Sequence, residues 1–184
     1  MKKYLSLILC IISGGYMLWY MHFGVPWTKG GALSKIGLYH RGYFIIWGGL
    51  TFIALAYALT LAYRRYLKTR AYIPLLSVCA AGMALTLMFD FDYDKMPDYW
   101  FHVIGSLAFS AVSSVTVFLL FLLCYKKGFV FKLFTCLTAA TLITDTVLLL
   151  IFKETGLIES VPILLAYIML CTVNLKKEKE YASR

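Results

Sequence analysis

Residues 89–102 read FDFDYDKMPDYWFH, and the interpretation of the whole chain starts from this stretch. Four of the nine acidic residues lie in it: Asp90, Asp92, Asp94 and Asp98. It also holds Trp100 and His102, and long apolar runs flank it at residues 71–88 and 103–125. An acidic, aromatic stretch between two apolar runs is typical of a short loop at a membrane surface, where aromatic rings prefer to sit.

The composition indicates a membrane protein. The chain has 184 residues, of which 61% are hydrophobic, and about 45–50% is usual in a soluble domain. A membrane span needs roughly 20 apolar residues to cross about 30 Å of hydrocarbon. Six such runs occupy residues 4–23, 42–63, 71–89, 100–125, 129–152 and 157–175. The runs are continuous rather than alternating, so the sequence predicts an all-α, polytopic membrane protein: one six-transmembrane-helix bundle over residues 1–184.

The basic residues predict the orientation of the bundle. If the amino terminus is cytoplasmic, the inner segments carry thirteen of the eighteen Lys and Arg residues. The outer segments carry only five: Lys29, Lys35, Arg41, Lys95 and Lys153. Cytoplasmic loops are enriched in basic residues, so both termini are expected inside and the loop Asp90–Asp98 outside. All four tryptophans (Trp19, Trp27, Trp47 and Trp100) then lie near the outer interface, and the plasma (cytoplasmic) membrane is the expected location.

The first run resembles a signal peptide but is expected to remain as a helix. Lys2 and Lys3 precede an apolar core at residues 5–12, yet no small-x-small cleavage site follows. The net charge of +9 is explained by the inner loops and tail, which can contact anionic lipid. A nucleic-acid partner is not expected, because the basic residues are scattered over several loops. Membrane lipids are the expected partners, with a protein partner or a second copy of the chain as alternatives.

Cysteines and small residues within the runs are interpreted as packing residues. The five cysteines share no C-x-x-C spacing, so the sequence suggests neither a redox pair nor a zinc knuckle. Run 100–125 carries a row of small residues: Gly105, Ser106, Ser110, Ser113 and Ser114. Gly82 offers a similar surface in run 71–89. Such residues let helices approach closely, and a polar conduit is the alternative interpretation.

Asp145 is the one charge well inside a run. A carboxylate near the centre of a membrane helix costs on the order of 3 kcal/mol, so it is expected to face protein or water and to have partners. Thr138 and Thr141 share its helix face. Tyrosines, a histidine or Arg41 are candidate partners across the bundle. The sequence leaves a structural, hydrogen-bonded aspartate and a working one equally open.

The three histidines are expected at the outer ends of the helices. His22 follows the first run, and His40 and His102 precede or open later ones. The predicted topology places them beside the acidic loop, so they are expected to form one outward-facing pocket, lined also by Trp27 and Trp100. Imidazoles and carboxylates at one depth could bind Zn²⁺ or another divalent cation, with His22, His40 and His102 as ligands, or simply form hydrogen bonds.

A calcium loop and the common catalytic motifs are not supported. The acids follow an EF-hand-like count, but Lys95 stands at the turn-glycine position and Phe101 at the position of the bidentate glutamate. No H-E-x-x-H motif and no nucleophile elbow occur in the sequence. No catalytic residue is therefore assigned, and a cofactor other than a divalent metal is not suggested.

Two short motifs carry a resemblance to a known family. The stretch His102-Val-Ile-Gly105-Ser106-Leu107-Ala-Phe109 resembles the opening of the fourth helix in DRAM/FRAG-type membrane proteins and a related uncharacterised bacterial six-helix family. Leu33-Ser34-Lys35-Ile36-Gly37 is similar to an Ile-Ser-Asp-Leu-Gly element in their first outer loop. Lys35 stands where that family tends to have Asp. The resemblance implies a lipid-associated, non-catalytic membrane role.

Two classes of function follow from these observations. The first is a non-catalytic membrane protein that binds or senses a lipid, small amphiphile or protein partner at the outer leaflet. The second is a small membrane enzyme or transporter that uses the outer His/Asp cluster and Asp145. The missing catalytic spacing favours the first class, and the clustering of ionisable groups at one depth favours the second. The candidate binding residues are His22, Trp27, His40, Asp90, Asp92, Asp94, Asp98, Trp100, His102 and Asp145.

Overall fold

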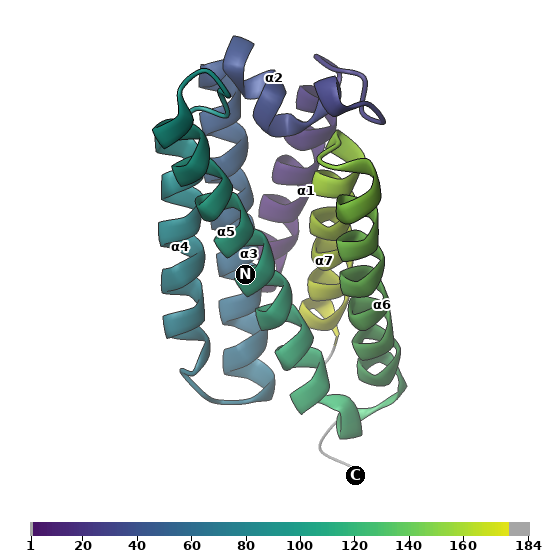
Figure 1. Cartoon of the computed structure of the whole chain (residues 1–184). Helices are drawn as coiled ribbons and strands as arrows, with labels where there is room; N and C mark the ends of the chain where they lie inside the picture. Colours follow the sequence, from purple (N-terminus) through teal and green to yellow (C-terminus); the bar gives the residue numbers. More distant parts are fainter. Residues whose placement is uncertain (1, 177–184) are drawn as a thin grey trace.

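The computed structural model describes residues 2–176, and all regular structure in that part of the chain is helical. The α-helices are α1 (Lys2–Met21), α2 (Leu33–Tyr39), α3 (Arg41–Tyr66), α4 (Tyr72–Met88), α5 (Met96–Leu123), α6 (Phe129–Phe152) and α7 (Gly156–Leu175). Two short 3₁₀ turns, η1 (Lys29–Gly31) and η2 (Tyr125–Lys127), lie in the connections. The predicted all-helical bundle is confirmed (Figure 1).

Five of these helices are long and apolar enough to cross a membrane: α1, α3, α5, α6 and α7. The predicted run 71–89 forms α4, which is also apolar but only 17 residues long. Figure 1 shows α4 lying beside the long helices, while α2 lies across one end of the bundle. We call this the α2 end, and the loops after α3 and α5 lie at the opposite end.

Helix α5 begins four residues earlier than the predicted run at residue 100. Pro97 occupies its first turn, where the missing N–H of proline leaves no hydrogen bond unmade. Asp98 lies in the same turn, where a negative charge complements the positive end of the helix dipole. These polar residues look like loop in a hydropathy pattern but are good residues for a helix start. The loop before α5 is correspondingly shorter than predicted.

Helices α4 and α5 approach each other through two glycines. A methyl group on Gly82 would lie 2.7 Å from the backbone nitrogen of Phe109 and 2.8 Å from the carbonyl oxygen of Gly105. A methyl group on Gly105 would lie 2.7 Å from the carbonyl oxygen of Gly82. No side chain fits at these separations, so the backbones pack directly on each other. The small residues predicted to allow close packing do so at this pair.

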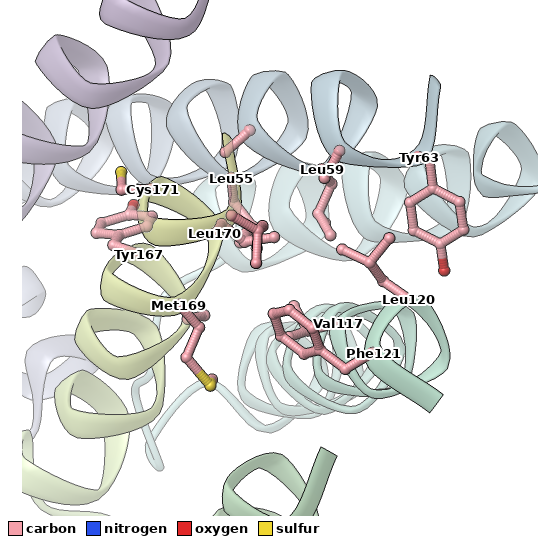
Figure 2. Packing of buried hydrophobic residues seen from close by; sticks show 14 of the residues in the cluster. Leu55, Leu59, Tyr63, Val117, Leu120, Phe121, Tyr167, Met169, Leu170 and Cys171 are labelled. Carbon is pink, nitrogen blue, oxygen red and sulfur yellow. The ribbon is translucent and has the colours of Figure 1, made fainter. Parts of the chain in front are cut away.

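The apolar core lies between α3, α5 and α7. Figure 2 shows Leu55, Leu59 and Tyr63 of α3 packed against residues of the other two helices, including Leu120 and Leu170. Three tyrosine hydroxyls in this core donate to backbone carbonyls. Tyr63 donates a hydrogen bond of 2.8 Å to the carbonyl of Thr116, for example. This pairing is needed because no water is available in an apolar interior to satisfy the group.

Basic residues close the helices at the end opposite α2. Arg65 donates to the last carbonyls of α7, including that of Asn174 at 2.7 Å. Lys127 donates to the carbonyl of Tyr66, where α3 ends. The last carbonyls of a helix have no partner within it and carry partial negative charge, so cations there are stabilising. The basic loops therefore cap helices in addition to carrying the charge that predicts orientation.

Candidate functional site

The segment between α1 and α3 folds back over the α2 end of the bundle (Figure 1). The amide of Leu157 donates to the carbonyl of Pro26 at 3.1 Å, which joins this segment to the start of α7. A methyl group on Gly156 would lie 2.5 Å from the carbonyl oxygen of Gly31, so the two backbones touch. The hydroxyl of Tyr20 donates to the carbonyl of Leu33 at 3.0 Å. These contacts hold α2 against α1 and α7.

The acidic loop is paired with cations rather than open. Asp90 forms an ion pair of 2.7 Å with Arg41, which also donates to the carbonyl of Phe89. Lys95 lies 4.0 Å from Asp90 and 3.9 Å from Asp92. The backbone amide of Asp94 donates to Asp92 at 3.1 Å, and Asp98 lies in the first turn of α5. Half of the predicted acidic cluster is therefore neutralised by neighbouring cations.

The structure places the three histidines in three different environments instead of one pocket. His22 is exposed. The ring of His40 packs on Phe23 and Tyr43, with ring centroids 4.7 Å and 5.8 Å away. His102 is buried, with 1% of its surface exposed. Each histidine is therefore held by a different set of neighbours.

The structure gives no support for the predicted metal site, and the tryptophan lining of the predicted outward-facing pocket stays a prediction. Trp27 and Trp100 are exposed, at 72% and 55%. Within residues 2–176, no group of three or more His, Cys, Asp or Glu side chains is placed to hold a metal ion. The three histidines differ in exposure and in the residues that they contact.

A buried hydrogen-bonded chain connects α5, α2 and α7. His102 donates from Nδ1 to the carbonyl of Phe89 at 2.9 Å, and its Nε2 lies 3.0 Å from Oγ of Ser34. The same Oγ lies 3.3 Å from a carboxylate oxygen of Glu159. The other carboxylate oxygen accepts from the backbone amide of Leu33. Glu159 thus caps the first turn of α2 and shares a hydroxyl with His102.

Glu159 also lines a pocket between α5, α6 and α7. The pocket has a volume of about 70 Å³ and reaches Asp145 on α6. Its remaining polar lining consists of hydroxyl groups from α5 and α6: Ser110, Ser113, Ser114, Thr138 and Thr141. Apolar side chains, including Phe109 and Pro162, form the other walls. Two carboxyl groups from neighbouring helices therefore face one small, partly polar space.

The polar groups of this pocket are mainly hydrogen-bond acceptors. Thr138 and Thr141 donate their hydroxyl protons to carbonyls of their own helix, at 2.6 Å and 2.8 Å. Ser113 does the same at 3.1 Å. Their oxygens keep lone pairs that can accept. Among residues 2–176, the Asp145 carboxylate has no hydrogen-bond or ion-pair partner.

Asp145 is also reachable from outside the bundle. It lines a shallow groove between α6 and α7 whose other walls are mostly apolar, including Leu148, Val161 and Leu165. Nearby side chains on the outer face of these helices are exposed, among them Leu150 at 72%. Asp145 therefore stands between the inner pocket and an apolar surface groove.

Glu154, in the connection between α6 and α7, is a third acid in this region. Burial raises the pKa of its carboxyl above the ordinary value for glutamate. The nearby ammonium group of Lys35 opposes that shift. Glu154 does not line the pocket, so it can serve as a matched control for the two carboxyl groups that do.

Sequence reasoning identified Asp145 and His102 but missed Ser34 and Glu159. A signal for Glu159 was present, because it is an acid at the third position of the predicted run 157–175. It was missed because helix starts commonly carry acids. Ser34 lies in the quoted motif at residues 33–37, but nothing in that motif indicated a hydrogen-bonding role. Its role depends on two partners that are far away in the sequence.

Comparisons with protein-family models, with curated proteins and with solved structures find no match to this chain. The resemblance to DRAM/FRAG-type membrane proteins therefore stays a prediction from two short motifs.

Proposed function

We propose that this is a plasma-membrane protein of six spans, with both termini in the cytoplasm and the α2 end outside. This assignment counts α4 as a span. It is supported by the five long apolar helices, the apolar character of α4 and the gathering of basic loops at one end. Cytoplasmic ends of membrane helices are enriched in Lys and Arg. The pocket then lies in the outer half of the membrane, because Asp145 is about 10 Å from the end of α6 at about 1.5 Å per residue.

The function that we propose is non-catalytic binding of an amphiphile with an amine head group in this pocket. The observation that carries the proposal is the unpartnered carboxylate of Asp145 beside the hydroxyls of Ser113, Thr138 and Thr141, which already donate their protons to backbone carbonyls. A wall of acceptors favours a head group that donates hydrogen bonds. A positive charge adds further stabilisation, because hydrogen bonds between ionised groups are about twice as strong as neutral ones. An ammonium group satisfies both requirements.

The groove between α6 and α7 is the proposed place for the apolar tail. It meets the pocket at Asp145, and its walls are aliphatic. An alkyl chain in this groove would remain in contact with lipid on its open side. The bound molecule would therefore enter sideways from the outer leaflet. This mode of binding agrees with the lipid-associated role that the family resemblance implies.

Transport of the same amphiphile is a second candidate function. It is favoured by the position of Asp145, which borders both the inner pocket and the groove. A carboxylate with access on two sides can pass a cation from one to the other. Binding alone and transport differ in one measurement, the movement of labelled amine across the wall of a vesicle that contains the protein.

The binding proposal is tested by measuring the affinity of labelled dodecylamine for the protein in lipid nanodiscs. Asp145→Asn removes the charge but keeps the size of the side chain. We expect it to weaken binding at least about tenfold, because a hydrogen bond to a charged group contributes about 1.5–3 kcal/mol. Glu154→Gln removes a neighbouring charge outside the pocket and is expected to leave the affinity within about twofold.

Dodecyl sulfate serves as a ligand of the same chain length and opposite charge. It should not compete with dodecylamine, because two carboxyl groups repel it. Equal affinity of the parent and the Asp145→Asn variant for dodecylamine, or effective competition by dodecyl sulfate, would show that the acceptor wall does not select the head group.

A further inference from the structure

The proton on Nδ1 of His102 is fixed by its partner. Nδ1 lies 2.9 Å from the carbonyl oxygen of Phe89, which can only accept. Nδ1 must therefore carry a hydrogen in every state that keeps this contact. The only proton of the imidazole that can come and go is the one on Nε2, which faces Ser34 at 3.0 Å.

Ser34 has a single hydroxyl proton, and its oxygen lies within hydrogen-bond distance of both Nε2 of His102 and a carboxylate oxygen of Glu159. If the hydroxyl donates to Glu159, its oxygen must accept from Nε2, so His102 is an imidazolium and Glu159 a carboxylate. If the hydroxyl donates to Nε2 instead, the oxygen must accept from a protonated Glu159, and both end groups are neutral. The two arrangements contain the same number of protons and differ only in the direction of each hydrogen bond.

We propose that His102, Ser34 and Glu159 form a proton relay that holds one transferable proton, so that Glu159 and His102 gain and lose their charges together. The geometry that carries the proposal is the pair of contacts at 3.0 Å and 3.3 Å on one hydroxyl oxygen. In the transfer, the O–H bond of Glu159 breaks as the O–H bond of Ser34 re-forms on that side. The original hydroxyl proton of Ser34 moves to Nε2. The total number of protons on His102, Ser34 and Glu159 does not change.

This relay deepens the proposed amine binding and rests on it for its biological use, because Glu159 lines the pocket. A cation in the pocket stabilises the carboxylate form of Glu159. The relay then moves the proton to His102, and positive charge shifts from the pocket toward the α2 end. Binding inside the membrane is thereby linked to a charge near the acidic loop. Arg41 and Asp90 lie close to His102, so a charge on the imidazole would act electrostatically on their ion pair.

Other charged and titratable groups surround both ends of the relay and set its balance. Glu159 and Asp145 line the same pocket, and Glu154 and Tyr20 lie near Glu159. The backbone amide of Leu33 donates to the carboxylate of Glu159. At the other end, the charged groups near His102 are Arg41 and Asp90.

A purely structural role of Glu159 as the cap of α2 can be separated from the relay. The cap requires the bond from the amide of Leu33, and the relay requires the hydroxyl of Ser34. Ser34→Ala removes the hydroxyl and leaves the capping amide in place. Glu159→Gln keeps the size of the side chain but cannot carry the proton. The two variants interrupt the relay at different points.

The state of His102 can be read directly, because the chain has only three histidines. In a His22→Gln, His40→Gln background, ¹⁵N-labelled histidine reports His102 alone by solid-state NMR in nanodiscs. We expect that dodecylamine raises the fraction of His102 that is protonated on both nitrogens by at least about twofold. Ser34→Ala should abolish this response while dodecylamine still binds, because Asp145 is intact. Glu154→Gln should keep a dodecylamine-induced increase, because the relay and Asp145 are intact, although the loss of this nearby acid can shift the ligand-free balance between Glu159 and His102.

A ligand-free comparison keeps the relay testable if dodecylamine does not bind, which would overturn the binding proposal alone. Glu159→Gln should lower the fraction of Nε2 that is protonated, and the same change in the Ser34→Ala background should have no effect. The relay is wrong if Glu159→Gln leaves Nε2 unchanged, if its effect persists without the hydroxyl, or if the neutral ring carries its proton on Nε2.

Discussion

Glu159 shows how a single side chain can tie distant parts of this molecule together. It caps α2 through the amide of Leu33, shares the hydroxyl of Ser34 with His102, and lines the pocket. Asp145 could be predicted from sequence because one charge in a long apolar run is conspicuous. The contacts of Glu159 could not, because its partners lie 125 and 126 residues away. Pairing between distant segments is decided by packing, which a single sequence does not reveal.

Glu154 gives a pH-dependent prediction at the same scale. Its carboxyl pKa is raised by burial, so the folded protein binds this proton more tightly than the unfolded chain does. Its contribution to stability is therefore fully present at pH values below the ordinary pKa of glutamate. That contribution is lost as the pH rises through the raised pKa of the folded state. Glu154→Gln should consequently stabilise the protein more at pH 8 than at pH 4.

Thermal unfolding of the parent and the Glu154→Gln variant in the same detergent checks this sign. The difference in melting temperature should favour the variant at pH 8 and shrink toward pH 4. If the parent gains relative to the variant as the pH rises, the electrostatic attraction between Glu154 and the ammonium group of Lys35 outweighs burial and the direction is wrong.

The packing of α4 on α5 was predicted in kind but not in detail. Small residues in both runs indicated a close approach, and the structure shows the backbones in contact at Gly82 and Gly105. The serines on α5 predicted the same kind of contact, yet Ser110, Ser113 and Ser114 line the pocket. Small size permits a close helix contact. Which small residues meet depends on the rotation of the helix about its axis.

Two glycine substitutions test this contact with a matched pair. Gly82→Ala places a methyl group 2.7 Å from the backbone of α5, so we expect it to lower the free energy of unfolding by about 1–3 kcal/mol. Gly49→Ala, on α3, has nothing within 4 Å of the new methyl group. It should be neutral or stabilising by up to about 1 kcal/mol, because alanine favours helix. Unfolding in mixed micelles of dodecyl sulfate and dodecylmaltoside measures both variants.

The result that would contradict close packing of α4 on α5 is an equal effect of the two substitutions. It would mean that α4 can move away from α5 at little cost.

The start of α5 shows how a helix boundary can be misplaced when it is predicted from hydropathy. Pro97 and Asp98 interrupt the apolar pattern but suit the first turn of a helix, so hydropathy alone placed the boundary too late.

At the scale of the whole molecule, composition and the pattern of apolar runs were sufficient to predict an all-helical bundle. The distribution of charged residues also indicated which loops lie at the same end of the bundle. The structure gathers the basic loops at one end and the acidic loop and α2 at the other. The relative rotation of the helices could not be predicted, and it decides which polar groups meet inside. The three histidines have different neighbours, and the hydrogen bonds that join His102, Ser34 and Glu159 could not be predicted from the sequence.

The proposed orientation of the membrane-spanning bundle places the α2 end, with the pocket beneath it, on the outer side of the membrane. Single cysteines in a background without the five native ones test it in intact cells, using a reagent that cannot cross the membrane. Asp94→Cys should be labelled from outside, and Lys126→Cys should be labelled only after the membrane is opened. Both side chains are exposed and cap no helix. Labelling of Lys126→Cys from outside, with Asp94→Cys protected, would reverse the orientation and contradict the account.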